Sequence, residues 1–108
     1  MEPVPVFRDP AQPVDVALGQ VFTIRLESNP STGYQWQLAQ PVDESIVKLE
    51  GSEYQPPATV LPGAGGTEAW TFRAVGQGET SIALKYIRPW EKETPPAEQQ
   101  TFAVVVHQ

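Results

Sequence analysis

Short segments in which apolar and polar residues alternate recur along the whole chain, and they constrain its fold more than any other feature. In "VFTIRLES", residues 21–28, the side chains of Phe22, Ile24 and Leu26 fall on one face of an extended strand. The same alternation occurs in "YQWQLAQ", "EAWTFRAV", "TSIALKYI" and "TFAVVVH", and weaker versions occur in "VPVF", "VDVAL" and "SIVKLEG". In the four further strong segments the residues expected to point inward are Tyr34, Trp36, Leu38, Trp70, Phe72, Ala74, Thr80, Ile82, Leu84, Tyr86, Phe102, Val104 and Val106. No segment has a helical period, so the pattern predicts an all-β fold.

The number and spacing of these segments indicate the architecture. About seven strands, with turn residues roughly every 8 to 12 positions, are typical of an immunoglobulin-like antiparallel β-sandwich of about seven to eight strands. The 108 residues are enough for a single domain, residues 1–108, with one hydrophobic core. The chain has no cysteine, so the sandwich is expected to hold by packing alone, with no disulfides.

Charge and hydropathy narrow the range of partners. The formal net charge of −6 argues against nucleic acid and anionic membranes as partners. No apolar run approaches the roughly 20 residues that span a bilayer. The start of the chain, "MEPVPVFRDP", lacks the basic flank and apolar core of a signal peptide. We therefore expect a soluble protein that is either cytoplasmic or the mature part of an exported protein.

Three connections between the predicted strands are longer than a tight hairpin needs. They are residues 29–33, "NPSTG", residues 55–66 and residues 88–98. Long connections on a rigid scaffold are where binding sites are usually found. In an immunoglobulin-like order they follow strands B, D and F. The first and third then meet at one end of the sandwich, and the second can reach that end if it folds up beside them.

Few residues offer catalytic chemistry. His107, the single histidine, lies next to the C-terminus and is poorly placed for a Ser-His-Asp arrangement. One histidine without cysteine supplies too few ligands for a structural metal site, and "LPGAGGTEAW" lacks the Gly-Lys-Ser/Thr ending of a phosphate-binding loop. The acidic residues Asp43, Glu44, Glu91 and Glu93 are expected on the surface, and a carboxylate pair for glycoside chemistry has no other support. We therefore predict that the protein is not an enzyme and uses no metal or cofactor.

The segment "YIRPWEK" places an unusual tryptophan outside the alternating pattern. Trp90 follows a proline that ends regular strand pairing, so its indole is expected on a connection and partly exposed. Two interpretations stay open. Trp90 either folds back over the end of the sandwich or serves as an interface anchor beside Arg88, since Trp and Arg dominate interface energetics. Pro89 stiffens the backbone that carries both.

Three motifs, "NPSTGYQW", "PGAGGTEAWTF" and "YIRPWE", occur in this order with strands between them. Together they resemble the chagasin family of cysteine protease inhibitors, and the resemblance runs from about residue 14 to residue 106. The family pattern is an Asn-Pro-Thr-Thr-Gly-aromatic turn, a Gly-rich middle loop and an Arg-Pro-Trp loop on an immunoglobulin-like sandwich without disulfides. Each motif alone is weak, whereas the three in register are fairly specific.

The resemblance implies reversible inhibition of a papain-like cysteine protease. Three loops, residues 29–34, 61–67 and 88–91, would enter the active-site cleft of the enzyme, with Ser31 and Thr32 nearest its catalytic Cys and His. The residues implied to bind the protease are Asn29, Pro30, Ser31, Thr32, Gly33, Tyr34, Leu61, Gly63, Ala64, Gly65, Gly66, Arg88, Pro89 and Trp90. A stiff turn suits this role, because a flexible loop would lose ordering entropy on binding. A monomer is sufficient for it.

Two residues depart from the family pattern. Ser31 stands where Thr is usual, and Tyr34 stands where Phe is common. The missing methyl group is worth about 1 kcal/mol if it is buried against the enzyme, and the Tyr34 hydroxyl needs a partner or water. These changes are expected to alter which protease is preferred. The alternative function is a non-inhibitory immunoglobulin-like module that binds a protein or a carbohydrate through the same connections or through a sheet face.

Overall fold

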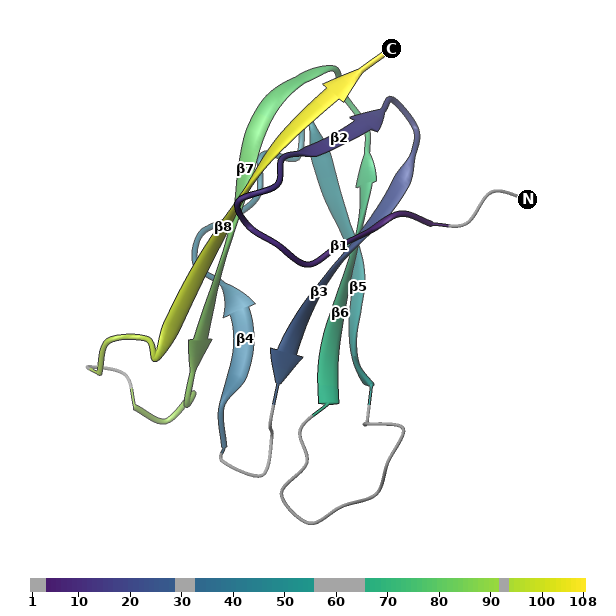
Figure 1. The fold of residues 1–108 in the computed structure, drawn as a ribbon. Coiled ribbons are helices and arrows are strands. Elements are labelled where there is room, and N and C mark those ends of the chain that lie inside the picture. The colour runs from purple at the N-terminus through teal and green to yellow at the C-terminus, as the bar shows by residue number, and fades with distance from the viewer. Residues whose placement is uncertain (1–3, 29–32, 56–65, 92–93) are drawn as a thin grey trace.

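The alternating segments form strands, and the strands pack as two four-stranded sheets face to face (Figure 1). The computed structural model describes residues 4–28, 33–55, 66–91 and 94–108. The first sheet contains, in spatial order, β1 (Val6–Phe7), β3 (Val21–Ser28), β6 (Gly66–Ala74) and β5 (Val47–Gln55). The second sheet contains β2 (Val14–Ala17), β8 (Glu98–His107), β7 (Gly78–Ile87) and β4 (Gln35–Leu38). The strong and the weak sequence candidates all correspond to strands, so the predicted all-β sandwich is confirmed.

The N-terminal segment contributes an edge strand to each sheet. β1 pairs with β3, and β2 pairs with β8, and both pairs are parallel, whereas the other pairs of the described residues are antiparallel. Residues 8–13 carry the chain from one sheet to the other between these two short strands (Figure 1). The predicted antiparallel sandwich is therefore found with two parallel additions at its edges. None of the described residues belongs to a helix with the length and apolar character to cross a membrane.

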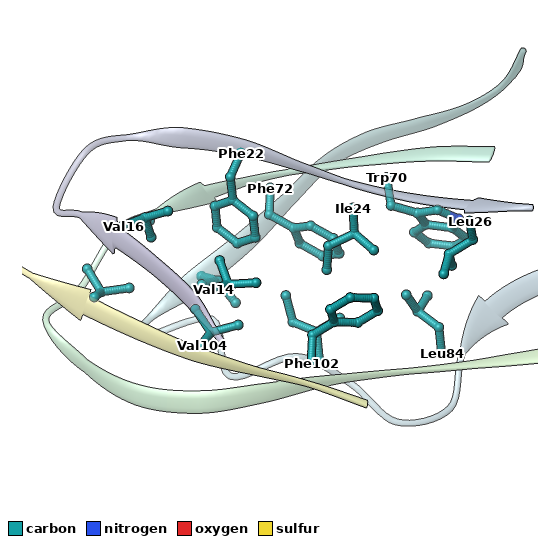
Figure 2. Close-up of a cluster of buried hydrophobic side chains, with 14 of the residues drawn as sticks. Val14, Val16, Phe22, Ile24, Leu26, Trp70, Phe72, Leu84, Phe102 and Val104 are labelled. Carbon is teal, nitrogen blue, oxygen red and sulfur yellow. The ribbon is translucent and has the colours of Figure 1, made fainter. Parts of the chain in front are cut away.

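The inward faces of the two sheets form one apolar core (Figure 2). Phe22 and Phe72 stack with ring centroids 5.6 Å apart, and Phe102 is fully buried on the facing sheet. Twelve of the predicted inward residues are buried: Phe22, Ile24, Leu26, Trp36, Trp70, Phe72, Ala74, Ile82, Leu84, Phe102, Val104 and Val106. Four others, Tyr34, Leu38, Thr80 and Tyr86, are only partly buried. With no cysteine available, this packing supplies the link that a disulfide provides in many immunoglobulin-like domains.

The three long connections leave the sandwich at one end (Figure 1). In the strand registers Ser28 lies opposite Gly66, Gln55 opposite Thr67, Gln35 opposite Ile87, and Tyr86 opposite Glu98. We call the end formed by these residues the loop end. The second connection starts and finishes at this end, so its stems lie beside those of the other two, as the predicted convergence requires. The antiparallel pairing of β3 with β6 sets this position, since it brings the start of β6 beside the end of β3.

Candidate functional site

A stack of aromatic rings extends from the core to the loop end. Trp36 lies opposite Tyr86 in the pairing of β4 with β7, and their ring centroids are 4.9 Å apart. The ring of Tyr86 then stacks on Tyr34 at 5.1 Å with an interplanar angle of 22°. The guanidinium of Arg88 lies 4.5 Å from the centroid of the Tyr34 ring, at the far end of the stack. We call Trp36, Tyr86 and Tyr34 the aromatic ladder, and Arg88 caps it by a cation–π contact.

A tight turn follows the ladder at the end of β7. The Glu91 N–H donates to the Arg88 carbonyl at 2.9 Å, and Arg88 Nη1 lies 3.3 Å from Glu91 Oε1. Pro89 occupies the second position of this four-residue turn, where its fixed φ suits the backbone. Trp90 at the third position is 67% exposed, which is the largest exposed fraction among the described large hydrophobic residues. The sequence prediction of a partly exposed Trp90 on the connection after the strand is confirmed.

The Trp90 indole lies against the base of the first connection. Gly33 has a φ of +85°, which favours glycine. A Cβ atom built there would overlap Cη2 of Trp90 and would lie 3.1 Å from Cζ2 and 3.4 Å from Cζ3. The interpretation in which Trp90 folds back over the end of the sandwich is therefore confirmed, and the interface role stays a prediction. Its ring packs on Gly33 from one side and stays open to solvent on the other.

Gly66 closes the base of the second connection. It is the first residue of β6, and a Cβ atom built there would overlap the Gln55 carbonyl oxygen and lie 2.6 Å from the Tyr54 hydroxyl. The Tyr54 ring therefore folds over Gly66, and only glycine leaves room for it. This packing alone accounts for a glycine at position 66.

The carboxylate of Glu68 connects three strand ends at the loop end. Its Oε2 accepts a hydrogen bond from Ser28 Oγ at 2.8 Å and another from the Trp36 backbone N–H at 3.1 Å. Trp36 makes a second link, because its indole N–H donates to the Glu27 carbonyl at 2.9 Å. Sequence reasoning did not select Glu68. A signal was available, since Glu68 has the same phase along β6 as the inward-facing Trp70 and Phe72.

A sequence model of the "Chagasin family peptidase inhibitor I42" matches residues 15–106 of the 108-residue chain. The chain belongs to the chagasin family of peptidase inhibitors. Chagasin from Trypanosoma cruzi is 36% identical over 90 residues, which cover 80% of this chain and 81% of chagasin.

Solved structures agree with this assignment at the level of the fold. The cysteine protease inhibitor EhICP2 from Entamoeba histolytica superposes with a TM-score of 0.80 at 23% identity and covers 96% of each chain. A more distant neighbour, PbICP-C, was solved in complex with falcipain-2 and superposes with a TM-score of 0.51 at 17% identity, covering 96% of this chain and 89% of that one. The chagasin-family resemblance read from the three motifs is therefore confirmed.

The structure describes part of the site predicted for this chagasin-family chain. Gly33, Tyr34, Arg88, Pro89 and Trp90 lie together at the loop end, and Gly66 lies at the same end opposite Ser28. The predicted site residues outside the described ranges are Asn29, Pro30, Ser31, Thr32, Leu61, Gly63, Ala64 and Gly65. Five of the described site residues make contacts within the chain, because Tyr34 and Arg88 belong to the capped ladder, Gly33 meets Trp90, and Gly66 meets Tyr54.

Residues with other possible chemistry lie away from the loop end of this family member. His107 Nε2 pairs with Asp15 Oδ1 at 2.7 Å on the exposed surface near the C-terminus. Hydrogen bonds from the Ser45 side chain and backbone lower the pKa of the exposed Asp43 carboxyl below its usual value. Among the described residues no group of three or more His, Cys, Asp or Glu side chains is arranged to hold a metal ion.

Proposed function

We propose that this protein inhibits papain-like cysteine peptidases reversibly by inserting its loop end into the active-site cleft. Membership of the chagasin family supports the inhibitory function. The complex of PbICP-C with falcipain-2, a papain-like cysteine protease, supports this class of target. The observation that carries the proposal for this chain is Trp90, a large exposed ring held on Gly33 at the loop end.

The described contacts give the loop end the character of a pre-organised inhibitor. The Arg88–Glu91 turn fixes the backbone that carries Trp90, and the aromatic ladder fixes Tyr34 beside it. Association with a protein costs less when the binding residues are ordered beforehand. Trp side chains also contribute strongly to interfaces when most of the ring is free to be buried by the partner. Both properties favour tight binding.

The proposed roles of the three connections follow their positions. Residues 29–34 would occupy the centre of the cleft, residues 61–67 would lie along one side, and residues 88–91 would lie along the other. A protease–inhibitor interface buries roughly 1,600 Å² in total, of which the inhibitor contributes about half. Three connections at one end of a small sandwich are sufficient for that area. In this proposal inhibition is non-covalent, with hydroxyl and backbone groups hydrogen-bonding near the catalytic pair and no scissile carbonyl aligned for attack.

Steady-state inhibition of papain and of a cathepsin L-like enzyme tests the proposal. We expect the parent protein to inhibit at least one of them, and Trp90→Ala to raise the inhibition constant by about 30-fold or more, equivalent to ~2 kcal/mol for the loss of an interface anchor. Leu18→Ala is the matched control, because Leu18 is 47% exposed and its N–H donates to the carbonyl of His107, at the end of β8 far from the loop end. Inhibition of neither enzyme, or equal effects of the two variants, would refute the proposal and favour a non-inhibitory binding module.

A further inference from the structure

Glu68 is a carboxylate on the inward face of a strand, at the point where the two sheets open toward the loop end. It is partly buried and follows the phase of Trp70 and Phe72 along β6. A groove of about 620 Å³ along the flank between β4 and β5 is lined by Glu68 together with Gly33, Tyr34 and other residues. The groove keeps the carboxylate near solvent, so its charge needs no buried counter-ion.

Two hydrogen bonds that Glu68 accepts from described residues join the stems of the first connection. Ser28 is the last residue of β3, directly before that connection, and its buried hydroxyl donates to Oε2 at 2.8 Å. Trp36 lies in β4, directly after it, and its backbone N–H donates to the same oxygen at 3.1 Å. A carboxylate suits this position because it accepts several hydrogen bonds and donates none. Bonds to an ionised acceptor are also stronger than neutral ones.

Glu68 also belongs to the stem of the second connection. β6 begins at Gly66, so the carboxylate stands two residues after that connection ends. Because Ser28 and Glu68 are on the first sheet and Trp36 is on the second, the same group spans both sheets. Trp36 in turn stacks on Tyr86 and so on the aromatic ladder beneath Tyr34. A movement of the Glu68 carboxylate is therefore transmitted to the bases of two connections and to the ladder.

We propose that Glu68 is a positioning residue for peptidase inhibition. Through Ser28 and Trp36 it holds the stems of the first and second connections in the relative placement that the peptidase cleft accepts. Glu68 itself contacts no enzyme in this arrangement. The inference rests on the proposed inhibitory function and adds to it the residue that sets the geometry of the loop end.

The test compares Glu68→Ala and Glu68→Gln with the control Glu79→Ala. Glu79 is an exposed glutamate near the start of β7, at the opposite end of the sandwich, so the control loses the same charge. For Glu68→Ala we expect the papain inhibition constant to rise about tenfold, equivalent to ~1.4 kcal/mol. Glu68→Gln should recover most of the affinity, because its amide oxygen still accepts both hydrogen bonds. Glu79→Ala should stay within about twofold of the parent, since exposed sites away from an interface contribute little.

Two further measurements separate positioning from a general loss of stability. Amide exchange at Trp36 should accelerate in Glu68→Ala, while exchange at the core residue Phe102 changes only with global stability. Ser28→Ala in the Glu68→Ala background should add little to the inhibition constant, because the two changes remove the same contact. Should Glu68→Ala fail to fold, Ser28→Ala alone removes one of the two donors and is expected to weaken inhibition in the same direction.

The possible outcomes distinguish this inference from the proposed function. If the parent inhibits and a folded Glu68→Ala has the inhibition constant of Glu79→Ala, the positioning role is refuted and the inhibitory function stands. If Glu68→Gln is as weak as Glu68→Ala, hydrogen-bond acceptance is not the basis of the effect and the inference also fails. If the parent inhibits neither peptidase, the proposed function fails, and the nuclear Overhauser contact between Gly33 and the Trp90 ring decides the positioning role. Its retention in Glu68→Ala would refute that role, and its loss would support it.

Discussion

Replacing Gly33 by alanine should strain the backbone and displace the Trp90 indole. The first effect comes from the φ of +85°, a conformation that costs a residue with a Cβ atom roughly 1–2 kcal/mol. The second effect comes from the new methyl group, which would overlap Cη2 of Trp90. Trp90 is 67% exposed, so about a third of its surface is covered in the folded protein. Losing that contact area of roughly 80 Å² costs at most about 2 kcal/mol at 25 cal/mol per Å².

Gly19 provides a control for the backbone effect alone. Its φ of +87° matches that of Gly33, and a Cβ atom built there has no neighbouring atom within 4 Å. Gly19→Ala should therefore lower the free energy of unfolding by roughly 1–2 kcal/mol and leave peptidase inhibition unchanged. Gly33→Ala should lower it by up to about 4 kcal/mol, the sum of the two contributions, and should weaken inhibition.

The contact is isolated by repeating both substitutions in a Trp90→Ala background. Urea unfolding followed by far-ultraviolet circular dichroism gives the free energies without relying on Trp90 fluorescence. In that background Gly33→Ala should cost no more than Gly19→Ala, because no indole remains to be displaced. The reasoning is refuted if Gly33→Ala and Gly19→Ala cost the same with Trp90 present. In that case Trp90 does not rest on Gly33 in solution.

Three other changes probe the scaffold. Trp36→Phe removes the indole donor to the Glu27 carbonyl, and urea unfolding should show that the free energy of unfolding falls by about 1–3 kcal/mol. An unchanged free energy would mean that this hydrogen bond between the sheets is dispensable. Phe102→Ala opens a cavity in the core and should lower the free energy of unfolding by about 3–5 kcal/mol in the same assay. A smaller decrease would indicate that the core collapses into the cavity. Asp43→Asn removes a carboxylate whose pKa is lowered by hydrogen bonds from Ser45. In the parent, the stabilising effect of the ionised Asp43 carboxylate should be present at neutral pH and should disappear as the pH falls through the lowered folded pKa. A stability difference between the parent and Asp43→Asn that grows toward acid pH would contradict this sign.

The strand pattern could be predicted because side-chain alternation is a local property of the sequence. In "VFTIRLES" the phase of Phe22, Ile24 and Leu26 alone identifies the buried face, and all three are buried. The less regular segment "SIVKLEG" was harder to place. β5 extends to Gln55 and has a register shift between Leu49 and Gly51. The shift interrupts the alternation of apolar and polar side chains from which a buried face is recognised.

The contacts of the loop end depend on strand register, which alternation does not determine. A shift of two residues between β4 and β7 would keep every side chain on its own face but would separate Trp36 from Tyr86. The cation–π contact of Arg88 and the packing of Trp90 on Gly33 follow from that register. The motifs could therefore indicate which residues matter, whereas the arrangement that holds them required the folded chain.

Trp36 connects the core to the aromatic ladder, and this has a consequence for how stability and inhibition are related. Trp36 is 3% exposed and belongs to the core cluster, and its ring also supports Tyr86 and, through it, Tyr34. Phe102 belongs to the core cluster without contributing a ring to the ladder. A cavity at Phe102 therefore lowers the population of folded molecules and leaves the loop end of each folded molecule intact. A change at Trp36 alters both the population of folded molecules and the loop end, so stability and affinity are coupled through this residue. Its indole also donates a hydrogen bond from one sheet to the other, in a chain without disulfides.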